Sequence, residues 1–110
     1  MGGELFRTEM LAAKLSLNES QRDQLYEIAD SARETIRPHV REMMLHREDM
    51  LALAQADSFD EAAVRRLATA QSAAMVEMMV AKLRKKHQIW QILDDRQRQE
   101  FEALMARHRP

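Results

Sequence analysis

A chain of 110 residues with only two glycines and two prolines has room for one domain but little room for sheets or long loops. Hydrophobic residues make up 45% and charged residues 32%, and the abundance of Ala, Leu and Met favours helices. The net charge of −1 argues against a nucleic-acid partner, no apolar run is long enough to span a membrane, and the lack of cysteine excludes disulfides and thiol catalysis.

Two helices are predicted in the first half of the chain. The first covers residues 4–15, and its apolar residues are Leu5, Phe6, Met10, Leu11 and Leu15. The second starts near Glu19 and keeps helical spacing of apolar residues as far as Pro38. Proline disfavours the α conformation in the residue before it and has no backbone donor, so we expect a kink or break there. The helix then resumes and continues to Leu53.

The turn over residues 56–60 separates the second helix from the third. Asp60 is expected to cap the third helix, and Phe59 is expected to pack against Val64 in the contact that fixes an entering chain. We therefore expect the third helix to start at Glu61.

The third helix is predicted to run to Ile92, which makes it about 45–50 Å long. A fourth helix is predicted to start at Asp94. Its expected buried residues are Phe101, Leu104 and Met105. Such long helices in so small a chain indicate an open layer, with too little core for a single subunit.

A homodimer would bury the apolar surface that a single subunit leaves exposed. Between residues 73 and 83 the third helix is apolar almost all round, and a helix that is apolar on all sides is covered on all sides. We expect a second copy of the chain to cover one side. The expected interface residues are Met75, Val76, Met79, Val80, Leu83 and Trp90. The alternative is a monomer in which the second and fourth helices wrap around the third.

Two hexapeptides, at residues 17–22 and 93–98, have the same construction. The shared positions are Leu17, Asn18, Gln21 and Arg22 in the first copy and Leu93, Asp94, Gln97 and Arg98 in the second. A short polar residue followed three positions later by glutamine is typical of a capping box, in which the two residues satisfy each other's backbone N–H groups at a helix start. The preceding leucines are expected to anchor each turn in the core.

The hexapeptides resemble the LTxxQ motif of the Spy/CpxP family of bacterial envelope-stress proteins, which also carry it twice. Residues 59–65 resemble the start of that family's long central helix, and residues 76–93 resemble the part that leads into the second motif. The likeness covers residues 15–107 and is closer to the CpxP branch than to Spy. The threonine of each motif is replaced here, by Asn18 and Asp94, which are also good helix caps.

The resemblance implies an all-α, cradle-shaped antiparallel homodimer in the periplasm, without catalytic activity. Spy-like members hold unfolding client proteins without ATP, and CpxP-like members also restrain a membrane sensor kinase; which task dominates stays open. The residues expected to hold helix starts together at each end of the cradle are Gln21, Arg22, Gln97 and Arg98. The periplasmic location rests on the resemblance alone, and residues 1–3 are typical of an engineered start that replaces a removed leader.

A row of arginines lies on the second helix. Arg33, Arg37 and Arg41 are four residues apart, with Arg47 further along, and like charges at this spacing cost about 0.2–0.5 kcal/mol per pair. A positive surface that attracts acidic or unfolded partners would explain them, and in the family the concave face is positive. The alternative is a solvated face neutralised by Asp30, Glu34, Glu42 and Glu48. The same two interpretations apply to Lys82, Arg84, Lys85, Lys86 and His87.

The chain contains nine methionines, and six of them form two groups. The groups are Met43, Met44 and Met50, and Met75, Met78 and Met79. Met-rich surfaces adapt to many partners, although filling of an ordinary core is the alternative. Met43 and Met44 cannot both face one core, because they are adjacent on a helix. We expect them, with Leu51, to make apolar contacts to a client.

Metal sensing is the alternative function, because one branch of the family detects metal ions. Four histidines are possible ligands: His39, His46, His87 and His108. No two of them are four residues apart, and the pair of His39 with Met43 at that spacing would suit only soft ions, so we expect no metal site and no cofactor. No nucleophile or phosphate-binding loop is recognisable, so we expect no enzyme. A helical adaptor with one fixed partner is a third hypothesis.

Overall fold

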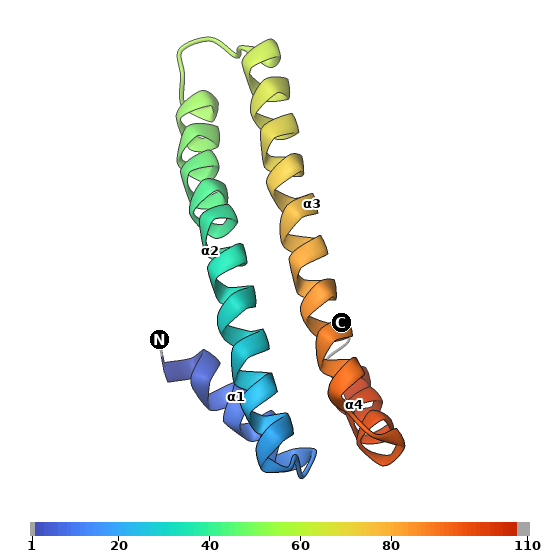
Figure 1. The fold of residues 1–110 in the computed structure, drawn as a ribbon. Coiled ribbons are helices and arrows are strands. Elements are labelled where there is room, and N and C mark those ends of the chain that lie inside the picture. The colour runs from blue at the N-terminus through green and yellow to red at the C-terminus, as the bar shows by residue number, and fades with distance from the viewer. Residues whose placement is uncertain (1, 108–110) are drawn as a thin grey trace. The chain divides into compact units, whose positions relative to one another are not determined.

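The computed structural model describes the backbone of residues 2–107 and the side chains of residues 7–107. Over this range the chain forms four α-helices and no strand (Figure 1). They are α1 (Gly2–Lys14), α2 (Glu19–Ala54), α3 (Glu61–Ile92) and α4 (Asp95–Arg107). The all-α prediction is confirmed, and α3 has the predicted bounds. Residue 1 and the side chains of Leu5, Phe6 and His108 lie outside the described part of the chain.

The expected break of the second helix is not found. α2 contains Pro38 and is helical on both sides of it and through it. A proline within a helix loses one backbone hydrogen bond and crowds the preceding turn, but the 36 residues of α2 include enough intact turns to continue past one defect.

The start of α3 was predicted in part correctly. Asp60 caps the helix, because its Oδ1 accepts a hydrogen bond from the Ala63 N–H at 3.0 Å. Phe59, which is predicted to pack against Val64, is 71% exposed, so any such contact buries little of its side chain.

The chain divides into two compact units, and each is described by itself. Unit 1 consists of residues 1–31 and 84–110, and unit 2 consists of residues 32–83. Both α2 and α3 contribute to each unit.

Unit 1 holds the hydrophobic core of the described residues. Its buried members come from all four helices and their connections: Ala12, Leu15, Leu17, Leu25, Ile89, Leu93 and Phe101. Leu104 and Met105 of α4 pack against this cluster and are partly buried, as expected. Leu17 and Leu93, the leucines that open the two hexapeptides, are 7% and 5% exposed, so both anchor their turns in the core as predicted.

Unit 2 is a two-helix hairpin with almost no buried core. Only Ala74 and Ala81 of its side chains are buried. The facing sides of α2 and α3 carry half-buried residues, among them His46, whose Nδ1 lies 2.8 Å from Gln71 Oε1. Two helices can bury only one side of each against the other, so the remaining faces of the hairpin stay exposed.

Candidate functional site

Both hexapeptides form reciprocal capping boxes. At the start of α2, the Asn18 N–H donates to Gln21 Oε1 at 3.0 Å, and the Gln21 N–H donates to Asn18 Oδ1 at 2.8 Å. At the start of α4, the Asp94 N–H donates to Gln97 Oε1 at 2.9 Å, and the Gln97 N–H donates to Asp94 Oδ1 at 2.8 Å. Asn and Asp therefore do what Ser or Thr does in other capping boxes.

The two glutamines also bind each other. Gln21 Nε2 donates to Gln97 Oε1 at 2.8 Å, and Gln97 Nε2 donates to Gln21 Oε1 at 3.0 Å. Gln21 Nε2 also donates to the Ile92 carbonyl at 2.7 Å, and Gln97 Nε2 lies 3.5 Å from the Ser16 carbonyl. We call this pair the glutamine clasp. It satisfies the hydrogen-bonding groups of Gln97, which is only 3% exposed.

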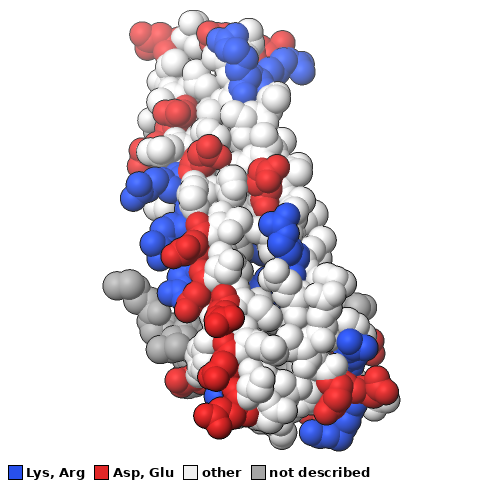
Figure 2. Space-filling model, viewed as in Figure 1, with Lys and Arg blue, Asp and Glu red and all other residues white. Residues whose placement is uncertain are grey.

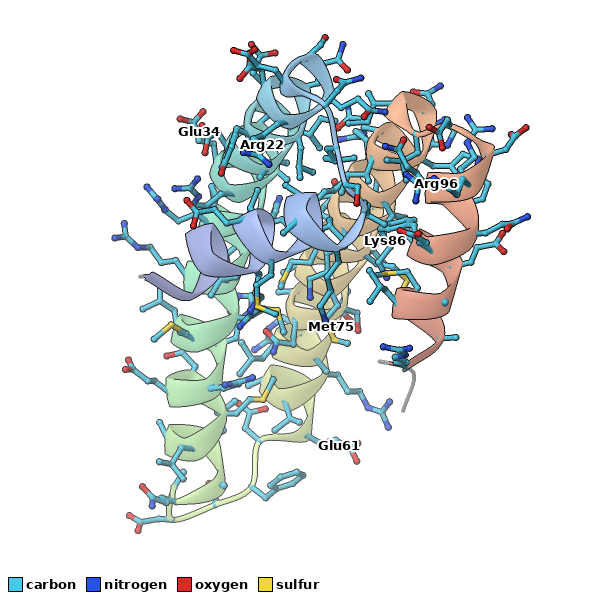
Figure 3. The ribbon with its side chains drawn as sticks, turned by 90° about the horizontal axis from the view of Figure 1, so that it is seen from below. Arg22, Glu34, Glu61, Met75, Lys86 and Arg96 are labelled. Atoms are coloured by element: carbon cyan, nitrogen blue, oxygen red, sulfur yellow. The ribbon has the colours of Figure 1, made fainter. Side chains whose placement is uncertain are left out.

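The clasp brings the two motifs of one chain together. Both copies meet at a single place in unit 1, where their glutamines bind each other. The clasp thus ties the start of α2 to the start of α4 (Figure 3, which labels Arg22 and Arg96 on these helices).

The chain enters the first motif through a Schellman turn at the end of α1. The Leu17 N–H bonds to the Ala12 carbonyl and the Ser16 N–H bonds to the Ala13 carbonyl, both at 3.1 Å. Ser16 has the left-handed φ of 53° that this turn requires, a position where glycine is usual. The turn directs Leu17 into the core and the Ser16 carbonyl toward the clasp.

The arginines that close the two motifs are placed differently. Arg98 Nε donates to the Trp90 carbonyl at 3.1 Å, and its guanidinium lies 4.9 Å from the centroid of the Trp90 ring. Arg22 is exposed, whereas Arg98 is half-buried. Trp90 packs against the unit 1 core and is half-buried, whereas the other five residues of the expected dimer interface are exposed.

Exposed apolar side chains are concentrated on unit 2. Of the twelve large hydrophobic side chains that are exposed among residues 7–107, all except Met10 belong to this unit. Five of them follow helical spacing on α3 and form what we call the α3 stripe: Met75, Val76, Met79, Val80 and Leu83. They are between 43% and 63% exposed and lie opposite the side that holds Ala74 and Ala81 (Figure 3 labels Met75 on α3).

A second set of exposed residues shares one side of α2. Val40, Met44 and Leu51, which we call the α2 stripe, are 40%, 60% and 58% exposed and follow helical spacing. Arg37 and Arg47 lie at neighbouring positions on the same side, with Arg41 beside them. Met43, one of the expected client contacts, is half-buried, because adjacent residues on a helix point about 100° apart.

The arginines of α2 are exposed but do not dominate the charge of unit 2. Within residues 7–107, Arg37, Arg41 and Arg47 have no carboxylate within 4 Å, whereas Arg33 does have an interaction partner. Seven basic and eight acidic residues lie between positions 32 and 83. Figure 2 shows Asp and Glu side chains interleaved with Lys and Arg on the visible face. The attraction of a distant acidic partner is therefore weak.

An open apolar groove of about 530 Å³ lies between α2 and α3 in unit 2. Its lining is Asp49, Ala52, Leu53, Ala63, Arg66, Leu67 and Ala70. Small alanine side chains on both helices leave the groove open, and one acidic and one basic residue lie among the lining residues. The groove therefore extends the apolar surface of unit 2 beyond the two stripes.

The histidines are dispersed. His39 Nδ1 lies 3.8 Å from Glu42 Oε2, and His46 Nδ1 lies 2.8 Å from Gln71 Oε1. In the part of the chain that the structure describes, there is no group of three or more His, Asp or Glu side chains that could hold a metal ion.

The fold and its motifs define a class of all-helical proteins. In this class a glutamine clasp joins two capping boxes, and a two-helix hairpin with almost no buried core exposes apolar side chains. Residues 5–105 match the model of a family that is described as "LTXXQ motif family protein". The chain therefore belongs to the LTXXQ motif family, which is the Spy/CpxP family.

No curated protein and no solved structure matches the chain. Within residues 2–107, no helix combines the length and the apolarity that crossing a membrane requires.

Proposed function

We propose that this protein holds unfolding proteins in the periplasm without ATP, through the exposed apolar surface of unit 2. The observation that carries the proposal is the unequal distribution of apolar side chains. Unit 1 contains the core cluster, while unit 2 contains eleven of the twelve large exposed hydrophobic side chains among the described residues. Exposed apolar patches on a soluble surface mark sites of interaction.

The composition of this surface suits clients of varied sequence. Met44, Met75 and Met79 are all more than half exposed. Methionine is unbranched and polarisable, so it adapts its shape to different apolar partners at little cost. A surface of this kind binds weakly and broadly, as an ATP-independent chaperone requires for release of its client.

We propose that the α3 stripe forms a homodimer interface. Its five side chains are between 43% and 63% exposed within their own chain, and a second copy would bury them against an equivalent stripe. The cradle shape of the family, with a bend of α2 at Pro38, is part of this proposal.

Sedimentation over a dilution series tests the interface. We expect the wild-type protein to shift from dimer to monomer on dilution, and Met79→Glu or Val80→Glu to be monomeric at concentrations where the wild type is not. Gln88→Glu, an exposed substitution further along α3, is the matched control and should dimerise normally. A wild-type protein that stays monomeric at every concentration would remove the dimer from the proposal.

We assign client contact to the α2 stripe, with Arg37, Arg41 and Arg47 providing short-range attraction beside it. The test is the aggregation of a chemically denatured client, followed by light scattering without nucleotide. We expect the wild type to suppress scattering and the Arg33→Glu, Arg37→Glu, Arg41→Glu triple variant to protect less. Unchanged protection by the triple variant would refute the role of the basic side chains, and absence of protection by the wild type would refute the chaperone function.

Restraint of an envelope-stress sensor kinase is the finer proposal, as in CpxP. The exposed Arg37, Arg41 and Arg47 would dock on an acidic periplasmic sensor domain. Binding of a purified sensor domain, measured by calorimetry at low and high salt, tests it. Loss of binding at high salt and in the triple arginine variant is the expected result, and salt-independent binding would contradict it.

A further inference from the structure

Adjacent methionines occur once on each helix of the hairpin, and the two members of each pair differ in exposure. On α2, Met43 is half-buried while Met44 is 60% exposed. On α3, Met78 is half-buried while Met79 is 63% exposed, and the neighbouring Met75 is 52% exposed. The outer methionines belong to the α2 and α3 stripes, so these exposed side chains lie in the surface to which the proposed function assigns binding.

The chain has no cysteine, so no thiol competes with methionine for an oxidant. A thioether reacts with a peroxide or a hypohalous acid by transfer of one oxygen atom. With hydrogen peroxide, the sulfur lone pair attacks one oxygen, the O–O bond breaks, a sulfur–oxygen bond forms, and the remaining oxygen leaves as water after proton transfer. The sulfur is oxidised by two electrons and the peroxide is reduced by two.

We propose that Met44, Met75 and Met79 are sulfoxidation sites that switch off the apolar surface of unit 2. Each sulfoxide replaces an adaptable apolar side chain by a polar, chiral one in the middle of a stripe. The product therefore disfavours both burial of the α3 stripe in a dimer and contact of the α2 stripe with an apolar client. The loss of binding rests on the proposed function, whereas the order in which the methionines oxidise does not.

Peptide mass mapping after timed exposure to hydrogen peroxide measures the order. We expect Met44, Met75 and Met79 to gain oxygen several-fold faster than Met43 and Met78 in the folded protein, and all five to react alike in urea. Rates are compared at the lowest concentration of a dilution series, because dimerisation would cover the α3 stripe. Equal rates within each adjacent pair of the folded protein would overturn the proposal.

Client protection after peroxide treatment tests the consequence. We compare the wild type, the outer variant Met44→Leu, Met75→Leu, Met79→Leu, and the inner variant Met43→Leu, Met78→Leu. Leucine is apolar and of similar size, and it does not form a sulfoxide. The protection by each variant after peroxide is compared with the protection by the same variant before treatment. Peroxide should abolish most of the protection by the wild type and by the inner variant but leave that of the outer variant at its own untreated level. Methionine sulfoxide reductases of both stereospecificities should restore the wild type.

Failure of the proposed function and failure of the oxidation switch give different results. An untreated wild type that does not protect clients would refute the proposed function and leave the oxidation order to be judged by the mass mapping alone. An untreated wild type that protects, and that still protects after Met44, Met75 and Met79 are oxidised, would refute the switch.

Discussion

Gln21 and Gln97 exchange two side-chain hydrogen bonds, of 2.8 and 3.0 Å, across 76 positions of the chain. Each amide also completes the capping box of its own helix. One residue type thus performs a local and a long-range task at once, because an amide has two donors and an acceptor with two lone pairs. The two copies of the motif therefore form one contact in unit 1, which links the start of α2 to the start of α4.

Gln97→Ala should lower the free energy of unfolding by about 2–3 kcal/mol, measured by urea denaturation. The substitution removes both clasp bonds of the Gln21 amide and leaves the Asp94 N–H without its side-chain acceptor, at a position that is 3% exposed. Gln99→Ala, on the exposed side of the same helix, is the control and should change stability little. A double variant with Gln21→Ala should cost less than the sum of the single changes, since each single change already breaks the clasp. Additive effects would show that the glutamines act separately.

Ser16→Gly should stabilise the protein by about 1 kcal/mol. Ser16 has a φ of 53°, where a β-carbon crowds the following carbonyl and glycine has none. Thermal and urea unfolding measure the change, and Ser16→Val should lower stability because its branched side chain fits that region worse. A destabilising glycine would mean that the serine hydroxyl contributes more than the strain it tolerates.

Local rules predicted the features that depend on neighbours in sequence. The capping boxes involve residues three apart, and the core positions of Leu17 and Leu93 follow from the residue that precedes each cap. The clasp could not be predicted in this way, because it depends on where the fold brings Gln21 and Gln97. The left-handed Ser16 also lacks a local signal, since serine stands where glycine would have marked the turn.

Two local rules describe the structure only in part. Pro38 predicts a kink or a break, and α2 continues through it without a break. Phe59 stands where a staple is expected, but 71% of it is exposed. The sequence also indicated that α3 has two apolar sides, and it did not indicate that Met43 and Met78 face inward while Met44 and Met79 face outward, because that depends on the helix register in the hairpin.

Arg98→Ala should change the fluorescence of Trp90, the only tryptophan in the chain. The substitution removes a cation 4.9 Å from the ring centroid and a donor to the Trp90 carbonyl, at a cost of about 1–2 kcal/mol in unfolding free energy. Arg22→Ala, at the matching position of the first motif, is exposed and should alter neither quantity much. Equal effects of the two substitutions would contradict the different placement of the arginines.

Pro38→Ala should stabilise α2, by up to about 3 kcal/mol. Alanine restores the missing N–H and removes the clash of the proline ring with the preceding turn. Slower hydrogen exchange of the amides in residues 34–42 would locate the gain on α2. If the bend proposed at Pro38 is needed to hold a client, the variant should be more stable and yet protect clients less.

Replacing apolar side chains of the α2 stripe should weaken client holding more than replacing the arginines beside it. Met44 and Leu51 are 60% and 58% exposed, and covering each contributes about 1 kcal/mol. Met44→Asp with Leu51→Asp should therefore lower client affinity about 30-fold.

The arginines act in a unit where acidic residues slightly outnumber basic ones. Salt screens exposed charges beyond about 8 Å at physiological ionic strength, so Arg37→Glu with Arg41→Glu should mainly slow association and remove its salt dependence. Stopped-flow binding of a fluorescent unfolded client separates the two effects, because the apolar changes should raise the dissociation rate and the arginine changes should lower the association rate. If the arginine variant lost more affinity than the apolar one, capture would be driven by charge and the exposed apolar stripe would need another explanation.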